Sequence, residues 1–183
     1  MINRCVIGIV GGPGTGKDTI AKMLPEILGQ AVDILSFSRL IIDEYCAPLG
    51  IEPTHKNLQF IGNALRPAWI HERIYQNIEK SQAKYFVIPS IRREEDFLFV
   101  RSFPTHLLIA IEAEPKTAYE RMKMRNEKPG ENNLTWEEYL TLCNAPIDQE
   151  VPKLRKQADI TIENNGTLEE LQEKLKTIFT EVA

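Results

Sequence analysis

The feature that most constrains the fold is a glycine-rich segment that directly follows an apolar run near the start of the chain. Residues 6–10 read VIGIV, and residues 11–19 read GGPGTGKDT. A short, continuous apolar run bounded by glycines is typical of a strand that is buried on both faces. Helical periodicity begins at Lys17 and continues to Leu28, so the glycines connect a buried strand to a helix. This order predicts an α/β architecture with a parallel sheet.

The glycine-rich segment has the spacing of a phosphate-binding loop. Gly11, Gly16 and Lys17 fit the pattern G-x-x-x-x-G-K, in which backbone N–H groups and the helix N-terminus surround phosphates and the lysine reaches the terminal ones. Asp18 stands where Ser or Thr usually follows the lysine, and Thr19 comes one place later. A plain turn with an exposed lysine is the alternative, but the placement between strand and helix favours phosphate binding. We predict that Asp18 and Thr19 hold the metal and that the phosphates bind to Gly11, Gly12, Pro13, Gly14, Thr15, Gly16, Lys17, Asp18 and Thr19.

Apolar runs and amphipathic segments alternate along the rest of the chain. Strands are predicted at residues 6–10, 32–37, 85–88, 107–111 and 159–162. Helices are predicted at residues 17–28, 38–49, 56–81 with an interruption at Pro67, 94–102 and 115–125, and after Thr135 and Thr167. We therefore expect a three-layer α/β fold with a five-stranded parallel sheet, formed by residues 1–183 as a single domain. Ligands of such a sheet bind at the carboxyl ends of its strands.

Two segments stand outside the regular alternation. Residues 38–82 form a long helical insertion between the second and third strands, which we expect to bind an acceptor. Residues 126–134 are polar and rich in turn residues, and we expect them to form a small lid. A lid suits phosphoryl transfer, because water must be kept away from the donor phosphoryl group.

The composition narrows the range of partners. The 22 Lys and Arg residues against 26 Asp and Glu residues give a net charge of −4, which argues against binding a nucleic-acid polymer or an anionic membrane. No apolar run approaches the roughly 18 residues of a membrane span. The three cysteines are far apart and the strand-like start leaves no room for a signal peptide, so we expect a cytoplasmic protein with reduced thiols. The three histidines share no metal-site spacing, and the oligomeric state is left open.

Three arginines are candidates for stabilising a transferring phosphoryl group, because planar guanidinium groups position and neutralise phosphate oxygens. Arg121 and Arg125 are four residues apart, hence on one helix face, and point toward the predicted lid. A solvated helix end is the alternative for this pair. Arg92 follows a buried strand at the ligand edge, where we expect it to contact phosphate.

Four segments resemble known kinases. The sequence GKDT at residues 16–19 resembles phage deoxynucleoside monophosphate kinases and phosphomevalonate kinases. Residues 158–171, ADITIENNGTLEEL, resemble the C-terminal end of dephospho-CoA kinases and their archaeal relatives. Residues 54–66, THKNLQFIGNALR, and 91–95, IRREE, are similar to the broader group of nucleoside-monophosphate-kinase-like proteins. The similarity covers nearly the whole chain.

The resemblance implies ATP and Mg²⁺ as cofactors, a small nucleotide-like acceptor, and backbone contacts from Asn165 and Gly166 to the adenine ring. It also brings departures. Residues 38–42 read SRLII, so that Arg39 stands where the group often has Asp. Residues 89–92 read PSIR, which keeps Arg92 but lacks the Asp of the group's Asp-Gly-x-Arg. The acceptor candidates are Arg39, Arg66 and, as a substitute for the missing carboxylate, Asp33.

Three functional interpretations follow. We expect transfer from ATP to a nucleoside or deoxynucleoside monophosphate, which needs no strong base. A dephospho-CoA-kinase-like enzyme would phosphorylate a hydroxyl and need a general base, for which Asp33 is the only candidate. A nucleotide-binding protein with degenerate kinase activity is the third. No Asn-Lys-x-Asp motif supports a GTPase, and no strand ends in the apolar-Asp-Glu pattern of motor ATPases.

Overall fold

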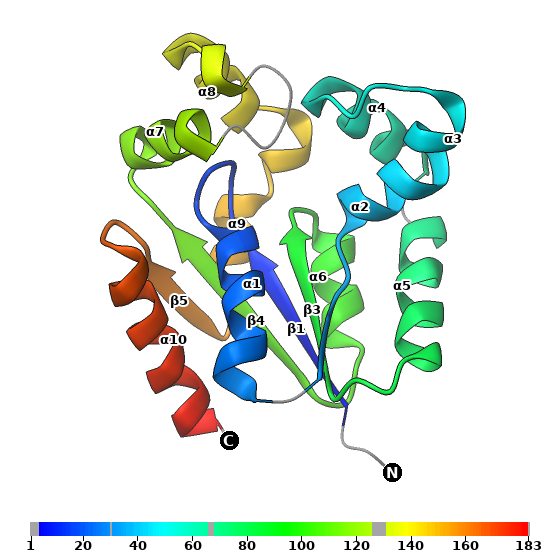
Figure 1. Ribbon diagram of the computed structural model, residues 1–183, viewed down its shortest axis with the longest axis vertical. Coiled ribbons are helices and arrows are strands. Elements are labelled where there is room, and N and C mark those ends of the chain that lie inside the picture. Colours follow the sequence, from blue (N-terminus) through cyan, green and yellow to red (C-terminus); the bar gives the residue numbers. More distant parts are fainter. Residues whose placement is uncertain (1–3, 30, 66–67, 126–130, 183) are drawn as a thin grey trace.

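A computed structural model describes residues 4–29, 31–65, 68–125 and 131–182. Within them lies a five-stranded parallel sheet with the order β2-β3-β1-β4-β5 (Figure 1). Its strands are β1 (Cys5–Val10), β2 (Val32–Ile34), β3 (Tyr85–Ile91), β4 (His106–Glu112) and β5 (Ile160–Glu163). The predicted three-layer α/β fold is confirmed.

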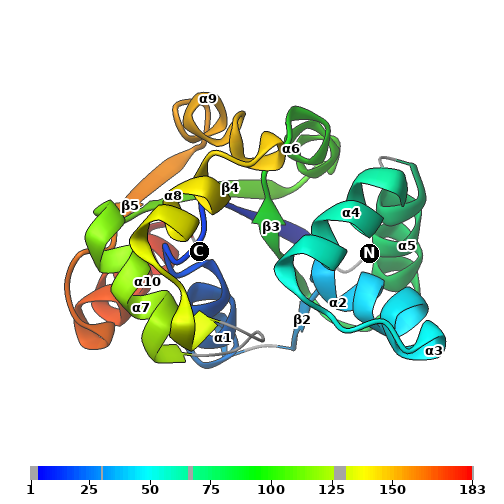
Figure 2. The same ribbon diagram turned by 90° about the horizontal axis from the view of Figure 1, so that it is seen from above.

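Helices cover both faces of the sheet and one of its edges (Figure 2). On one face lie α1 (Lys17–Leu28) and α10 (Leu168–Val182), and on the other lie α6 (Glu94–Arg101) and α9 (Val151–Arg155). Beside β2 and β3 lie α2 (Phe37–Ile41), α3 (Ala47–Leu49), α4 (His55–Leu65) and α5 (Ala68–Lys80). At the carboxyl edge of the sheet lie α7 (Pro115–Arg125) and α8 (Trp136–Cys143). Thr135 caps the N-terminus of α8, as predicted.

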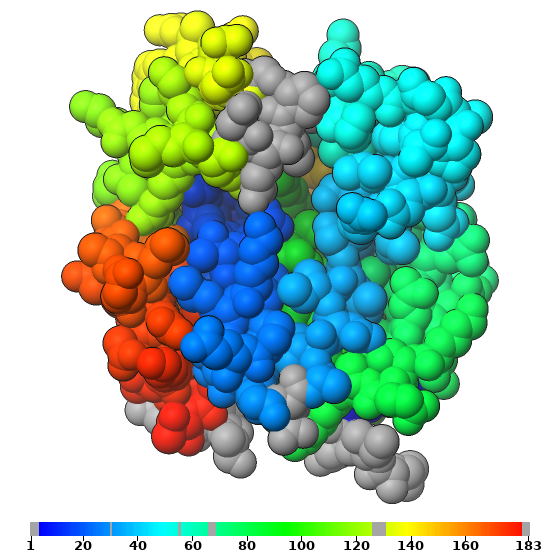
Figure 3. Space-filling model, in the orientation of Figure 1, coloured from blue at the N-terminus to red at the C-terminus, as the bar shows by residue number. Residues whose placement is uncertain are grey.

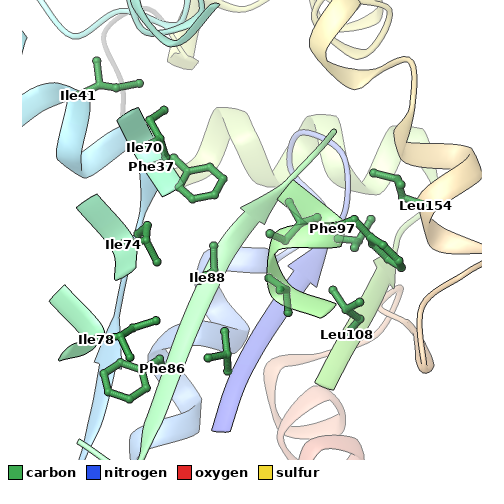
Figure 4. Packing of buried hydrophobic residues seen from close by; sticks show 14 of the residues in the cluster. Phe37, Ile41, Ile70, Ile74, Ile78, Phe86, Ile88, Phe97, Leu108 and Leu154 are labelled. Atoms are coloured by element: carbon green, nitrogen blue, oxygen red, sulfur yellow. The ribbon is translucent and has the colours of Figure 1, made fainter. Parts of the chain in front are cut away.

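The core confirms that the central strands are buried on both faces. Val6 and Val10 of β1 belong to one apolar cluster, whereas Ile7 and Ile9 belong to the cluster on the opposite face. Such alternation is the geometry of a strand, and a continuous apolar run places apolar side chains on both sides. Figure 4 shows how the side chains of α5, spaced four residues apart, meet those of β3; the labelled ones are Ile70, Ile74, Ile78, Phe86 and Ile88.

The third strand is longer than predicted, because it continues through Pro89 and Ser90. Along β1 the pairing advances from Gly8 to Val10, while along β3 it advances from Ile88 to Ile91. The extra residue in β3 makes a bulge, and a bulge is a position where a strand tolerates a proline that cannot donate a hydrogen bond. The prediction that the strand ends at Ile88 is therefore wrong, and Arg92 directly follows the strand.

Two further boundaries differ from the prediction. The second strand ends at Ile34 instead of Phe37, because the Ser36 hydroxyl accepts a hydrogen bond from the Arg39 N–H and starts α2. The helix predicted at residues 38–49 is divided into α2, a π-helical turn at Ile42–Cys46, and α3. The short helix α9 was not predicted. Most of the lid prediction falls on residues 126–130, outside the described part of the chain; Glu131–Asn133 form one 3-10 turn.

Candidate phosphate-transfer site

The glycine-rich loop between β1 and α1 takes a shape that only glycine allows at two positions. Gly14 and Gly16 have φ values of 73° and 106°. A Cβ atom at Gly14 would lie 2.3 Å from the backbone oxygen of Ala118, and one at Gly16 would lie 2.5 Å from Nδ2 of Asn164. Gly12, by contrast, has open space around it. The loop is thus held against α7 and the residue that follows β5, while the space beside Gly12 stays open.

Lys17 is buried, with 6% of its surface exposed, unlike the exposed lysine of the alternative, a plain turn. Its Nζ donates a hydrogen bond to the Gly12 carbonyl oxygen at 2.5 Å, and the Thr15 hydroxyl donates to the same oxygen at 3.0 Å. Burial and the nearby Arg92 guanidinium lower the pKa of Lys17 to about 7. Among the described residues the hydrogen-bond acceptor of this ammonium group is the Gly12 carbonyl oxygen, which phosphate oxygens can replace.

A cavity of about 440 Å³ lies on one side of the loop. Its walls come from the loop, α7 and the segment between β5 and α10, and they are formed by Gly14, Gly16, Thr19, Arg121, Met124, Arg125, Asn164, Gly166, Thr167 and Leu168. Met124 and Leu168 are 77% and 60% exposed at its rim. Two exposed apolar side chains beside a guanidinium group make a surface suited to a flat aromatic ring.

A second cavity of about 100 Å³ lies on the other side of Lys17. It is lined by Lys17, Asp18, Ser36, Phe37, Ser38, Ile41, Leu58, Gln59, Gly62, Pro89, Ser90, Arg92 and Ile147. These residues come from α1, α2, α4, the end of β3 and the turn after α8. Figure 3 shows α1 between α7 and the start of α10 on one side and α2 and α3 on the other. We refer to the 440 Å³ cavity as the donor-side cavity and to the 100 Å³ cavity as the acceptor-side cavity, after the ligands that we propose for them below.

The two arginines of α7 make different contacts, although they share one helix face. Arg121 donates from Nη1 to the Asn164 carbonyl oxygen at 2.6 Å and from Nη2 to the Gly166 carbonyl oxygen at 2.8 Å. Arg125 forms a bidentate pair with the buried carboxylate of Glu131, at 2.9 and 3.3 Å. Its Nη1 also lies 3.8 Å from the Asp18 carboxylate, close to the phosphate loop.

The remaining predicted residues are placed as follows. Arg92 lines the acceptor-side cavity, and its Nη1 donates to Oδ2 of Asp148 at 3.0 Å. Arg39 lies outside both cavities, where its exposed side chain pairs with Asp43 at 2.8 Å. Asp33 is on β2 opposite Phe86 and also lies outside both cavities. Arg66 falls outside the described residues.

Two functional residues were missed by sequence reasoning. Asn164 donates from Nδ2 to the Thr15 carbonyl oxygen at 2.9 Å and so fixes the phosphate loop from 149 residues away. Asp148 brings a buried carboxylate to Arg92 from a 3-10 turn at Pro146–Asp148. Asn164 directly precedes Asn165 and Gly166, which the resemblance had placed at the adenine ring, so the sequence did point to this segment. Asp148 is one acidic residue in a polar segment, and no local pattern distinguishes it.

The donor set fits a metal that is held partly by nucleotide phosphates. Among the described residues no group of three or more His, Cys, Asp or Glu side chains could hold a metal ion alone. Asp18 and Thr19 lie at the start of α1, and half of the Asp18 side chain is exposed. One carboxylate, one hydroxyl and phosphate oxygens are ligands that Mg²⁺ accepts.

These features define the class: the chain is a P-loop protein with a kinase-like fold. It belongs to the AAA domain family, which matches residues 10–139. No helix within residues 4–29, 31–65, 68–125 and 131–182 is long and apolar enough to span a membrane.

Proteins of similar sequence include several from archaea. A UPF0200 protein of Aeropyrum pernix is 27% identical over 175 residues, covering 93% of this chain and 89% of the relative. A UPF0200 protein of Methanococcus maripaludis is 24% identical over 186 residues, covering 97% of each chain. Among solved structures, shikimate kinase from Bacteroides thetaiotaomicron matches 96% of this chain and 98% of its own at 13% identity, with a TM-score of 0.65. At that identity the likeness shows the fold alone.

Proposed function

We propose that the protein is an ATP-dependent phosphotransferase that acts on a small nucleotide-like acceptor, in the first place a nucleoside or deoxynucleoside monophosphate. The observation that carries this proposal is the pair of cavities on opposite sides of Lys17. Gly14, Gly16 and Thr19 line the larger one, whereas Lys17 and Asp18 line the smaller one. Direct transfer between two substrates requires such an arrangement, because donor and acceptor must meet end to end at the phosphate loop.

The donor-side cavity supports a nucleoside triphosphate with its base at the rim. The ring would lie against Met124 and Leu168, near the backbone at Asn165 and Gly166, while the phosphates follow the loop toward Lys17. Arg121, tied to the carbonyl oxygens of Asn164 and Gly166, would keep the rim in shape. ATP is the donor that this arrangement and the kinase-like fold favour.

Transfer needs groups that offset the charge of the moving phosphoryl group. Mg²⁺, bound through Asp18, Thr19 and the phosphates, supplies positive charge when present. Lys17 lies beside the terminal phosphates, Arg92 approaches from the acceptor side, and Arg125 approaches from α7. An oxygen of the acceptor phosphate attacks the γ-phosphorus of ATP, the bond to the bridging oxygen breaks, and ADP leaves with that oxygen.

The position of Asp33 favours a phosphate over a hydroxyl as the attacking group. A hydroxyl acceptor needs a nearby base, and Asp33, the candidate base from sequence, lies outside the acceptor-side cavity. Among the described lining residues the carboxylate in this cavity is Asp18, which lies near Arg125. A phosphate acceptor is already ionised at neutral pH and needs no proton removal.

A coupled ADP-release assay across all nucleoside and deoxynucleoside monophosphates, with dephospho-CoA as a further acceptor, tests the proposal. We expect stimulation by one monophosphate and a loss of several orders of magnitude in Lys17→Ala, with no loss in Lys116→Ala as an exposed-lysine control. Stimulation by dephospho-CoA alone would move the assignment to the hydroxyl-phosphorylating alternative. Tight ATP binding without stimulation by any acceptor would overturn the proposal in favour of a degenerate nucleotide-binding protein.

A further inference from the structure

One charged contact at the acceptor-side cavity has no part in the function proposed so far. Asp148 has 2% of its side chain exposed, and its Oδ2 accepts the hydrogen bond from Arg92 at 3.0 Å. Burying a carboxylate is costly unless a cation and hydrogen bonds compensate it. A carboxylate kept at this position, 56 residues away from its arginine along the chain, therefore calls for a physical reason.

The contacts of Arg92 suggest the reason. Its side chain is 20% exposed, and it lines the acceptor-side cavity next to Ser90. Within the described residues its hydrogen bonding goes to Asp148 through Nη1. A guanidinium group has five N–H donors, so Nε and Nη2 retain donors for an anionic ligand. Arg92 is also close enough to Lys17 to lower the pKa of that lysine.

Two cations beside one another repel, and a long arginine side chain has many rotamers, so Arg92 would turn toward solvent without a partner. The Asp148 carboxylate opposes this motion because it accepts a hydrogen bond from Nη1 of the Arg92 guanidinium. It also acts on Lys17 in the direction opposite to Arg92. Asp148 thus keeps the two cations near each other while the site holds no phosphate.

The segment that carries Asp148 is itself firmly attached. The Asp148 N–H donates to the Ala145 carbonyl oxygen at 2.8 Å. Further along, Glu150 accepts a hydrogen bond from the Glu94 N–H, and the Gln157 carbonyl oxygen accepts one from Arg101. Like the Arg92–Asp148 pair, each of the last two contacts joins residues that are 56 apart in the sequence. The segment that carries Asp148 is therefore tied at several points to α6 and to the residues between β3 and α6.

We propose that Asp148 is a positioning residue, which holds the Arg92 guanidinium at the wall of the acceptor-side cavity so that its remaining N–H groups receive the phosphate of the acceptor. This inference rests on the proposed function for the identity of the acceptor. The end of β3 lacks the Asp that the related group has there, and we infer that Asp148, from the turn after α8, supplies a carboxylate in its place. The role of this carboxylate is in the affinity for the acceptor rather than in ATP binding.

The test is a double-mutant comparison of Asp148→Asn, Arg92→Ala and the combined variant. The matched control is Glu94→Gln, which removes the exposed Lys153–Glu94 pair between the same two segments. The measurements are kcat and KM for the monophosphate that is most active in the ADP-release assay, together with the Kd of ATP. We expect Asp148→Asn to raise the acceptor KM about tenfold, to leave the ATP Kd within about twofold, and to have no further effect in the Arg92→Ala background.

An equal effect of Asp148→Asn in both backgrounds, a similar effect of Glu94→Gln, or a loss that falls on ATP affinity would overturn the inference. Should Asp148→Asn not fold, Asp148→Glu keeps the charge at an altered length, and the same comparison with Arg92→Ala decides.

A readout independent of turnover separates this inference from the proposed function. In ¹⁵N NMR spectra the Arg92 Nε–H signal is followed while inorganic phosphate is added in the presence of ADP. We expect the wild-type signal to shift with phosphate and Asp148→Asn to need several times more of it. The same phosphate dependence in the wild type and in Asp148→Asn would refute the positioning role. If the two proteins differ in phosphate dependence but the wild type shows no acceptor-stimulated ADP release, only the proposed function is refuted.

Discussion

The two sides of the phosphate loop are built differently. On the donor side, backbone groups and fixed polar contacts dominate: Asn164 binds the Thr15 carbonyl, and Arg121 binds carbonyls of the loop that follows β5. On the acceptor side, the cavity is lined by residues of α1, α2, α4 and the end of β3, among them three serines at positions 36, 38 and 90. A donor triphosphate can be held by a conformation of the backbone, whereas a particular acceptor must be recognised by side chains.

Of the substitutions that test this difference between the two sides, those of the two arginines of α7 are expected to change activity most. Arg125, near Asp18 and the phosphate loop, is predicted to lie on the transferring group, so Arg125→Ala should reduce kcat on the order of 10²–10³-fold with a modest change in ATP Kd. Arg121→Ala should instead raise the ATP Kd, because Arg121 holds the donor-side rim. Kinetics and ATP titration of both variants check this, and the reverse assignment of effects would contradict it.

The next effect is expected at the loop glycines. Gly14→Ala places a Cβ against the backbone of α7 at a positive φ, so we expect a loss of more than about 2 kcal/mol in stability and of most nucleotide affinity. Gly12→Ala meets open space and serves as the control. Denaturant unfolding and ATP titration distinguish the two variants. Equal tolerance of both would mean that backbone shape does not define the donor side.

A third effect concerns the pH dependence of folding. The pKa of Lys17 is about 7 in the folded protein and near 10.5 when unfolded, so between these values the unfolded chain binds the additional proton. The free energy of unfolding therefore rises with pH across this window. The loss of stability that comes from burying the protonated Lys17 is complete below pH 7. Relative to Lys17→Met, the wild type should gain about 1 kcal/mol per pH unit between pH 8 and 9, without nucleotide or Mg²⁺. Parallel stability curves for the two proteins would contradict the lowered pKa.

The smallest effect is expected on the acceptor side. The Ser90 hydroxyl is buried without a hydrogen-bond partner among the described residues and belongs to the acceptor-side cavity. Ser90→Ala should leave the free energy of unfolding within about 0.5 kcal/mol, because no bond is lost. It should raise the acceptor KM several-fold while the ATP Kd stays unchanged. A loss of stability in thermal unfolding would mean that the hydroxyl has a structural partner.

The difference between the two sides also explains what the sequence predicts. The phosphate loop and the strands are local: a glycine pattern and a continuous apolar run determine them within about ten residues. The Asn164 contact, the burial of Lys17 and the Arg92–Asp148 pair depend on segments far apart in the chain, and no local pattern encodes them. The bulge at Pro89 was missed for a related reason, since its proline is tolerated only because of how β3 pairs with β1.

Prediction of the acceptor side was weaker because it rested on resemblance at positions where this chain departs from the group. Asp33 was chosen as a substitute for a carboxylate that the pattern lacks and Arg39 as a candidate contact for the acceptor, and both lie outside the cavities. The structure brings other groups there, Ser36, Ser38 and Gln59, whose hydroxyl and amide groups carry no recognisable spacing.

The hydrogen bond between Asn164 and the phosphate loop has a consequence for the order in which the molecule matures during its synthesis. The loop leaves the ribosome before its partner, which is made 149 residues later. The neighbours of β1 in the sheet, β3 and β4, also come long after it. A nascent chain therefore holds the phosphate loop without its Asn164 contact until the segment after β5 has been made, and nucleotide can stabilise only a chain that has been made that far.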